Sequence, residues 1–283
     1  MSWITSVYEP LPDLEGYLRR IGYTGTRELT RENLNALVYA HQCTVPFENL
    51  DCCRYSEPIR LDIPHLYEKI VTNRRGGYCF ELNGAFAAML RAFGFDAYTT
   101  TCRLARGEGP RPVMHRGCVI RLDGKTYFCD VGFGGPMAPF AVEVSAEPQT
   151  FYGETYWITE LSDGWYRLCR RKGEGNSIGD DNTVEAGEAP VAFFPLTAFM
   201  DEDFGPFSYQ CSAVPTARFV TRLWANLRTT TGYKSLINTE YTVVVNGIKT
   251  VTEVPEDKLD EVLLTEFGLK KCEYLIPVPE PAM

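Results

Sequence analysis

The chain has 283 residues, of which 45% are hydrophobic and 23% charged, and its formal net charge is −9. This composition is typical of an ordinary globular protein, and the length suggests roughly two domains with a sizeable core. The negative charge argues against nucleic acid or an anionic membrane as the main partner, and no apolar run approaches the roughly 20 residues of a membrane span.

The cysteine and histidine content indicates which cellular compartment to expect and whether a metal site is expected. The chain has ten cysteines without a C-x-x-C pair, and three histidines without metal-ligand spacing. The first residues, MSWITSVYEP, lack the basic and apolar regions of a signal peptide. We therefore expect a cytoplasmic protein with reduced, mostly buried thiols and no bound metal.

Residues 1–93 are predicted to be mainly helical. Asp13 can cap a first helix and Thr30 a second, while Pro64 fits the first turn of a third. His41 falls on the inner, apolar face of the second helix. We expect it to be packed and hydrogen-bonded rather than catalytic.

The stretch RRGGYCFELN, residues 74–83, places two glycines shortly before Cys79. Apolar residues then follow at the spacing of one buried helix face: Leu82, Phe86, Met89, Leu90 and Phe93. Cys79 is therefore expected in the first turn of a helix, where free N–H groups and the macrodipole favour a thiolate. The glycines would let the loop bend and a substrate approach the sulfur. We expect Arg75 and Glu81 to form a structural ion pair, and the alternative for Cys79 is a small buried cysteine.

From residue 94 to 194 the hydrophobic pattern has period two, which predicts an antiparallel barrel or sheet. Asp123-Gly124 is a strong signal for a two-residue hairpin turn. Pairing outward from this turn sets Leu122 opposite Lys125, and it places His115 and Asp130 on one face, roughly 7–8 Å apart at the backbone. A slip of one residue would separate the two side chains. The hairpin thus predicts a His–Asp pair.

Residues 195–283 are predicted to form an α/β unit. Apolar residues four apart predict a helix with an inward face made of Phe219, Leu223 and Leu227. Asn246-Gly247 lies between two β-branched runs and indicates a hairpin, and a final helix is expected from Pro255 to Gly268.

A cysteine at a helix start together with a His–Asp pair is typical of an activated thiol nucleophile. At this point the chain resembles the arylamine N-acetyltransferases. The motifs that carry the resemblance are RGGYCFELN around Cys79, His115 before the hairpin, DVGFG at 130–134 and VPFENLD at 45–51. They cover the first half of the chain closely, whereas the last third agrees only by pattern.

The resemblance implies an α+β fold with a core like that of cysteine proteases and transglutaminases. A helical bundle (1–93) would carry the nucleophile, an antiparallel β-barrel (94–194) the histidine and aspartate, and an α/β lid (195–283) would complete a cleft. The chemistry would be ping-pong transfer of an acetyl or short acyl group from acetyl-CoA, without a metal, to arylamines, arylhydrazines or N-hydroxyarylamines. The implied site residues are the catalytic Cys79, His115 and Asp130 and the substrate-contacting Phe47, Gly132, Phe133 and Gly134.

Other functions remain open from the sequence. An amide synthase of the same family needs the same three catalytic residues, and a transglutaminase-like thiol hydrolase uses Cys, His and Asp in the same chain order. A third alternative is a binding protein that kept only the fold. The residues that would contact CoA in the last third stay unassigned, with Arg218 and Lys234 conceivable. The physiological amine, the acyl-chain preference and the oligomeric state are not specified by the motifs.

Overall fold

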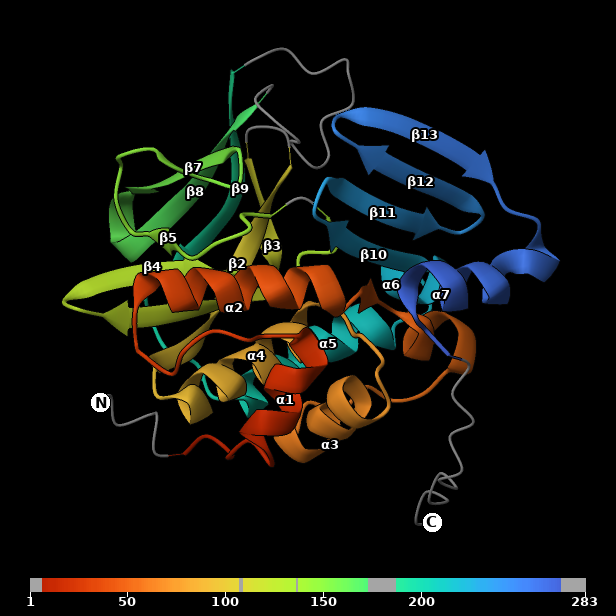
Figure 1. Ribbon diagram of the computed structural model, residues 1–283, viewed down its shortest axis with the longest axis horizontal. Helices are drawn as coiled ribbons and strands as arrows, with labels where there is room; N and C mark the ends of the chain where they lie inside the picture. The colour runs from red at the N-terminus through yellow and green to blue at the C-terminus, as the bar shows by residue number, and fades with distance from the viewer. Residues whose placement is uncertain (1–6, 107–108, 136, 173–186, 271–283) are drawn as a thin grey trace.

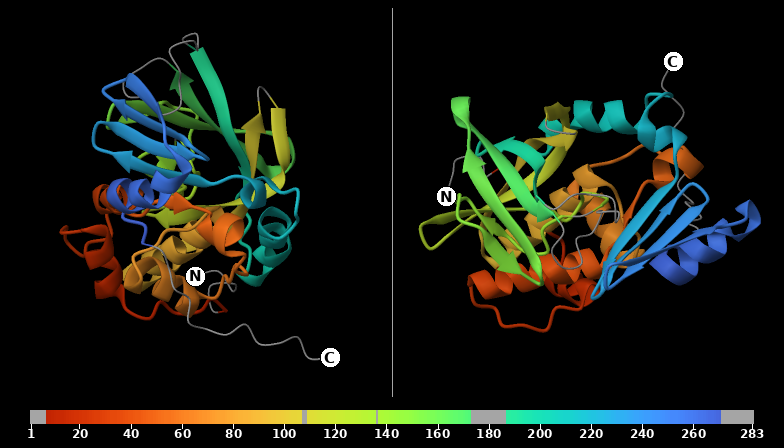
Figure 2. Two further views of the ribbon diagram at one scale, coloured as in Figure 1. Left: turned by 90° about the vertical axis from the view of Figure 1, so that its right-hand side faces the viewer. Right: turned by 90° about the horizontal axis from the view of Figure 1, so that it is seen from above.

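The structure is a computed structural model that describes residues 7–106, 109–135, 137–172 and 187–270. In Figure 1 its helical part lies beneath two groups of strands, which stand side by side there and in the right-hand view of Figure 2. The helices are α1 (Leu14–Ile21), α2 (Arg31–Thr44), α3 (Ile63–Tyr67) and α4 (Cys79–Phe93). In the described residues no helix has the length and apolar character needed to cross a membrane.

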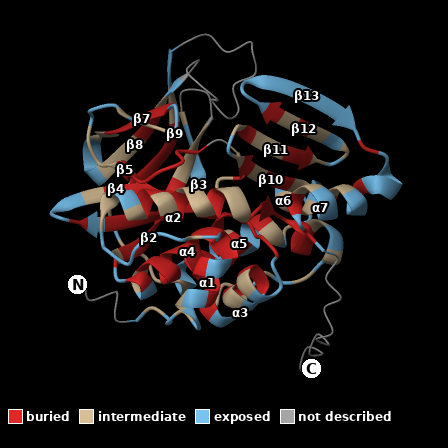
Figure 3. Cartoon of the chain, viewed as in Figure 1, coloured by how far each residue is buried: buried red, intermediate tan, exposed pale blue. Residues whose placement is uncertain are grey.

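The helix boundaries follow from local capping, as the sequence predicts. The Asp13 side chain accepts hydrogen bonds from the N–H groups of Glu15 and Gly16 at the start of α1, and Thr30 accepts one from Asn33 at the start of α2. Helix α4 lies at the centre of this part, with every residue buried except Arg91 and Ala92 (Figure 3). An all-round apolar helix is stable only inside a core, so α4 fixes the position of whatever it carries.

The first group of strands is a nearly closed antiparallel barrel with the strand order β5-β4-β3-β2-β9-β8-β7-β6. Its strands are β2 (Asp96–Arg106), β3 (Gly109–Leu122), β4 (Lys125–Cys129), β5 (Val142–Glu143), β6 (Gln149–Phe151), β7 (Glu154–Glu160), β8 (Trp165–Lys172) and β9 (Gly187–Pro195). The Ile158 N–H on β7 donates to the Ser145 carbonyl at 2.9 Å, which links β7 to the segment after β5.

The β3–β4 hairpin has the predicted register. Leu122 pairs with Lys125 and Cys118 with Cys129, so the turn consists of Asp123 and Gly124. Both turn residues have positive φ, 50° and 74°, as a type I′ turn requires. The sequence prediction for this hairpin is therefore confirmed.

The last third forms a second sheet, in the order β1-β10-β11-β12-β13, with three helices. Its elements are β1 (Phe47–Glu48), β10 (Trp224–Thr229), β11 (Gly232–Ile237), β12 (Glu240–Val245), β13 (Ile248–Glu253), α5 (Gly205–Ser212), α6 (Arg218–Thr221) and α7 (Leu259–Phe267). Strand β1 comes from the helical part of the chain and pairs with β10, with Phe47 opposite Asn226. The hairpin at Asn246-Gly247 and the helix end at Gly268 are confirmed.

The helix predicted through Phe219, Leu223 and Leu227 is wrong. Helix α6 ends at Thr221, and β10 begins three residues later. The same apolar residues also alternate, and Leu223 and Ala225 pack with α7 in a small separate core. The local sequence fits the apolar spacing of a helix and that of a strand equally well, and pairing with β1 and β11 makes this segment a strand.

Candidate active site

A cleft of about 410 Å³ lies where the helical part, the barrel and the second sheet meet. It is lined by Cys79 from α4, by Met114 and His115 from β3, and by Gly132 and Phe133 from the loop after β4. Phe47, Phe219 and Trp224 form an aromatic wall from β1, α6 and β10. Every part of the chain thus contributes to one cavity, and its chemistry is concentrated on the barrel and α4.

Cys79 is the first residue of α4, and Glu81 fixes that helix start. The Glu81 carboxylate accepts from the Tyr78 N–H at 3.0 Å, which satisfies one of the amides that a helix start leaves without a partner. The two preceding glycines serve packing rather than substrate approach. A Cβ on Gly76 would stand 1.9 Å from the Pro46 carbonyl, and the Gly77 carbonyl accepts from the Glu48 N–H.

His115 and Asp130 meet as the hairpin register predicts. His115 Nε2 lies 2.5 Å from Asp130 Oδ2, and both side chains are buried. The other carboxylate oxygen, Oδ1, accepts from Asn83 Nδ2 at 2.7 Å and from the Gly132 N–H at 2.8 Å. These donors fix the carboxylate, so Asp130 engages Nε2 and leaves Nδ1 as the imidazole nitrogen for a further partner.

Asn83 is a site residue that the sequence analysis missed. It lies one turn after Cys79, and its Nδ2 also donates to the Arg116 carbonyl at 2.7 Å. Its Oδ1 accepts from the Val131 N–H at 3.0 Å, so one amide ties α4 to β3 and to the loop after β4. The available signal was a polar residue at i+4 from Cys79, on the same side of a helix whose other residues are mostly apolar.

The Cys79 thiol is not acidic on its own. Burial raises its pKa well above the ordinary value, and Cys211 and Asp130 add to this, against hydrogen bonds from the backbone of Arg116 and Phe80. The first-turn N–H of Phe80 thus lowers the Cys79 pKa, in the direction that the sequence predicts, but burial outweighs it. The thiol needs a base to take its proton, and His115 borders the same cleft.

The loop after Asp130 packs directly on the start of α4. A Cβ on Gly132 would stand 2.9 Å from Cys79 Cα, so only glycine allows this approach. Phe133 lines the cleft, and its ring meets the His115 ring edge-on with centroids 5.8 Å apart. Gly134 lies beside the cleft rather than on it, where its φ of 74° and the Phe47 ring leave no room for a side chain.

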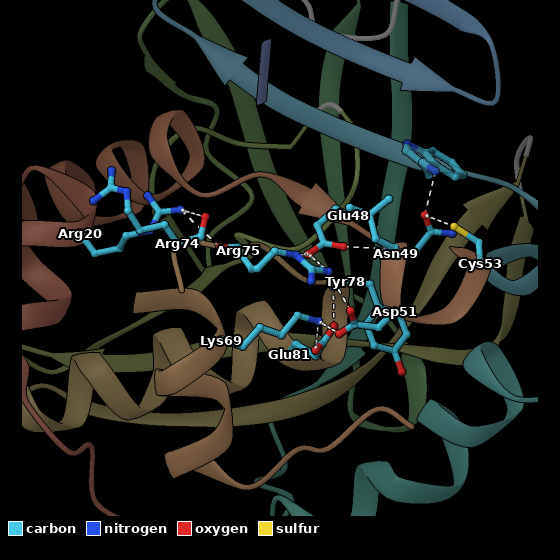
Figure 4. A network of polar contacts seen from close by, with 12 residues as sticks. Arg20, Glu48, Asn49, Asp51, Cys53, Lys69, Arg74, Arg75, Tyr78 and Glu81 are labelled. Carbon is cyan, nitrogen blue, oxygen red and sulfur yellow. Dashed lines mark hydrogen bonds and ion pairs between the residues drawn. The ribbon is translucent and has the colours of Figure 1, made fainter. Parts of the chain in front are cut away.

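A buried ionic network lies behind the helix start (Figure 4). Arg75 pairs with Glu48 and Asp51, both at 2.8 Å, and Lys69 pairs with Asp51 and Glu81, both at 2.6 Å. The predicted Arg75–Glu81 pair is thus wrong, because each residue pairs with a different partner and Asp51 connects the two halves.

Burial would lower the pKa of Lys69, but Glu81, Glu48 and Asp51 raise it above its usual value. The ammonium therefore stays charged inside the core, where it neutralises part of the surrounding carboxylate charge. In the described part of the chain the structure contains no cluster of three histidine, cysteine or acidic side chains that could hold a metal ion. His41 is packed as expected, with Nε2 3.0 Å from the Tyr17 hydroxyl.

Comparisons with known proteins agree with this geometry. A family model described as N-acetyltransferase matches residues 30–273. The arylamine N-acetyltransferase of Mycolicibacterium smegmatis is 32% identical over 223 residues, which cover 75% of this chain and 74% of that protein. The Escherichia coli (strain K12) arylamine N-acetyltransferase is 38% identical over 158 residues, and the matched segment spans only 56% of that relative.

Solved structures match over nearly the whole chain. The arylamine N-acetyltransferase of Salmonella typhimurium superposes with a TM-score of 0.82 at 26% identity, covering 95% of this chain and 96% of that one. The Mycobacterium marinum arylamine N-acetyltransferase in complex with CoA has a TM-score of 0.79 at 26% identity, covering 90% of this chain and 92% of that one. The predicted fold class, with helical bundle, β-barrel and α/β lid, is confirmed.

Proposed function

This chain belongs to the arylamine N-acetyltransferase family, and from that premise we propose that it transfers an acetyl or short acyl group from acyl-CoA to an arylamine, an arylhydrazine or an N-hydroxyarylamine. In this proposal Cys79 is the nucleophile, His115 the proton carrier, and Asp130 orients the imidazole. The observation that carries the assignment is the 2.5 Å contact between His115 Nε2 and Asp130 Oδ2, at the cleft that Cys79 also lines.

The first half-reaction acetylates the enzyme. His115 Nδ1 takes the Cys79 proton, and the thiolate attacks the thioester carbonyl carbon. The Cys79 N–H, one of the amides at the start of α4, is our candidate donor to the oxyanion. The bond between the carbonyl carbon and the CoA sulfur then breaks, and the leaving thiolate takes the proton from the imidazolium. Acetyl-Cys79 and free CoA are the products of this step.

The second half-reaction returns the enzyme to its starting state. The amine nitrogen attacks acetyl-Cys79 and gives its proton to His115, after which the bond between carbon and Sγ breaks. The sulfur takes the proton back, and the N-acetyl product leaves. Phe47, Phe133, Phe219 and Trp224 supply aromatic surface against which an arylamine ring can pack.

The raised pKa of the Cys79 thiol supports a proton transfer coupled to catalysis. Because Asp130 stabilises the imidazolium, the Cys–His ion pair is accessible even though the isolated thiolate is disfavoured. The same arrangement makes a mechanism that depends on a freely ionised thiol unfavourable.

Intact-mass spectrometry tests this function directly. The protein incubated with acetyl-CoA and no amine should gain one acetyl group on Cys79, and addition of an arylamine such as aniline should remove it and yield the N-acetyl product. Cys79→Ala should give no adduct, and Cys53→Ala, which changes a half-buried thiol outside the cleft, should react like the unchanged protein. Hydrolysis of an amide or ester substrate without any acetyl adduct would contradict the proposal and favour a thiol hydrolase.

A further inference from the structure

The chain and its proposed acyl donor are both negatively charged. The protein carries a formal net charge of −9, whereas acyl-CoA carries a 3′-phosphate and a pyrophosphate, so the two repel at long range. We propose that Arg111, Arg218 and Arg222 form a cationic rim at the cleft that binds the phosphate groups of acyl-CoA. This inference rests on the proposed function, and it names the residues that select the donor.

Two of these arginines border the cleft from separate parts of the fold. Arg111 lies on β3, four residues before His115, and Arg218 is the first residue of α6. Both line the cavity that Cys79 lines. Arg222 follows α6 directly and is exposed. A donor whose thioester reaches Cys79 therefore extends past side chains contributed by both the barrel and the last third of the chain.

Among the described residues, the rim arginines have no carboxylate partner, unlike three of the buried arginines. Arg75, Arg116 and Arg228 each form an ion pair with an acidic side chain. Across residues 7–106, 109–135, 137–172 and 187–270, none of the three rim arginines does. A guanidinium without an intramolecular partner keeps its N–H donors available for a phosphate, to which it can bind in a bidentate manner.

The surroundings of Arg218 also favour an anion. Its guanidinium lies over the Trp224 ring, 4.6 Å from the centroid, and this stacking restricts it at the cleft. Burial lowers the pKa of Arg218, and the positive charges of Arg222 and Arg111 lower it further. A bound phosphate would relieve this mutual repulsion of like charges.

The chemistry of the two substrates separates the rim from the aromatic wall. A neutral arylamine gains nothing from three guanidinium groups, whereas its ring fits the wall formed by Phe47, Phe219 and Trp224. The rim therefore acts on the acyl donor, and its loss should be visible only with donors that carry phosphate.

Donor kinetics test the rim. We would measure kcat/KM for acetyl-CoA, acetyl-dephospho-CoA and phosphate-free S-acetylpantetheine in the variants Arg111→Gln, Arg218→Gln and Arg222→Gln. A charged hydrogen bond contributes about 1.5–3 kcal/mol, so we expect roughly a tenfold or greater loss for acetyl-CoA in Arg111→Gln and Arg218→Gln, mostly in KM. The ratio of acetyl-CoA to S-acetylpantetheine activity should fall by a similar factor, and Arg218→Lys should restore part of it. The dephospho donor reports which phosphate is bound.

Lys249→Gln is the matched control, because it removes one positive charge from exposed strand β13. It should leave the donor ratio unchanged. Raising the ionic strength should raise KM for acetyl-CoA in the unchanged protein, and less so in Arg218→Gln. An equal loss with all three donors, or no loss with acetyl-CoA, would overturn the rim. Failure of the proposed function has a different signature, since the unchanged protein would then be acetylated by none of the donors.

Discussion

Ionisable side chains are buried in two kinds of surroundings in this protein. His115 borders the cleft, Asp130 contacts the His115 imidazole from the side, and neutral donors from Asn83 and Gly132 fix the carboxylate. Lys69 and Glu81 are sealed in the helical part, where each faces a charge of opposite sign. Exposure does not distinguish the two regions, because His115 and Lys69 are both 2% exposed.

Access and partner chemistry distinguish them instead. At the cleft, the proposed mechanism has His115 use its second ring nitrogen to carry a proton, so a change of its charge would be part of the reaction. In the sealed network every charge already has a partner, and a change of protonation would leave another charge unpaired. We therefore expect substitutions at the cleft to reduce activity and substitutions in the network to reduce stability.

The largest effect is expected for Asp130→Asn. Its Oδ1 must still accept from Asn83 and Gly132, so the new amide nitrogen faces His115 Nε2 and donates to it. The imidazole then carries its proton on Nδ1 and cannot take one from Cys79. We expect acetyl transfer to fall by about 10⁴-fold with little change in unfolding temperature. Asp123→Asn in the hairpin turn is the control, and full activity in Asp130→Asn would show that the carboxylate has no role in the reaction.

Lys69→Met should mainly lower stability. Removing the ammonium leaves Asp51 and Glu81 buried with one cation fewer, and such losses cost about 3–5 kcal/mol of unfolding free energy. Denaturant unfolding measures this, and the acetyl-transfer rate of the folded fraction should stay within a few fold.

Lys125→Met provides the matched comparison for Lys69→Met, because Lys125 pairs with Glu143 at the surface. Its cost should stay below about 1 kcal/mol. Similar losses of unfolding free energy in Lys69→Met and Lys125→Met would mean that the buried ionic network does not stabilise the start of α4.

The last expected effect is confined to acidic pH, where His41 introduces a pH dependence of the unfolding free energy. Burial and then Arg20 lower the pKa of His41 from 6.5 to about 3. Between these two pH values the imidazole is protonated in the unfolded chain but neutral in the folded chain. The unfolding free energy is therefore highest above pH 6.5 and decreases as the pH falls towards 3. The expected slope is roughly 1.4 kcal/mol per pH unit in that window.

Denaturant unfolding of His41→Gln between pH 4 and 7 tests this. The variant should lose most of the slope, whatever its stability at neutral pH, while His65→Gln, which alters a partly buried histidine, should lose less. Parallel curves for the unchanged protein and His41→Gln would assign the acid sensitivity to other groups.

Helix-capping and turn preferences predicted many of the element boundaries and the His115–Asp130 contact of the candidate site. The caps at Asp13 and Thr30 and the turn at Asp123-Gly124 depend on neighbours within a few residues, so the sequence was sufficient for them. The β3–β4 register then followed, and with it the His115–Asp130 contact.

Features that depend on distant partners were not accessible in the same way. Arg75 pairs with Glu48, and Glu81 pairs with Lys69. Both pairs form only because strand β1 and the segment after α3 pack behind α4. The helix predicted through Leu223 and Leu227 failed because its strand alternative is chosen by β1, more than 170 residues earlier. Asn83 was overlooked for the same reason, since its three partners lie on the barrel and the loop that follows it.

Strand β1 has a consequence for the order of assembly. Phe47 and Glu48 are made before Cys79, yet their strand partner β10 is made more than 170 residues later. The Asn49 side chain also depends on this later segment, because it forms hydrogen bonds with the backbone of Phe219, Arg222 and Trp224. During synthesis the helical part and the barrel can fold first. Cys79 therefore lacks the Phe219 and Trp224 part of its aromatic wall until the second sheet has been made, and we expect a nascent chain to remain inactive up to that point.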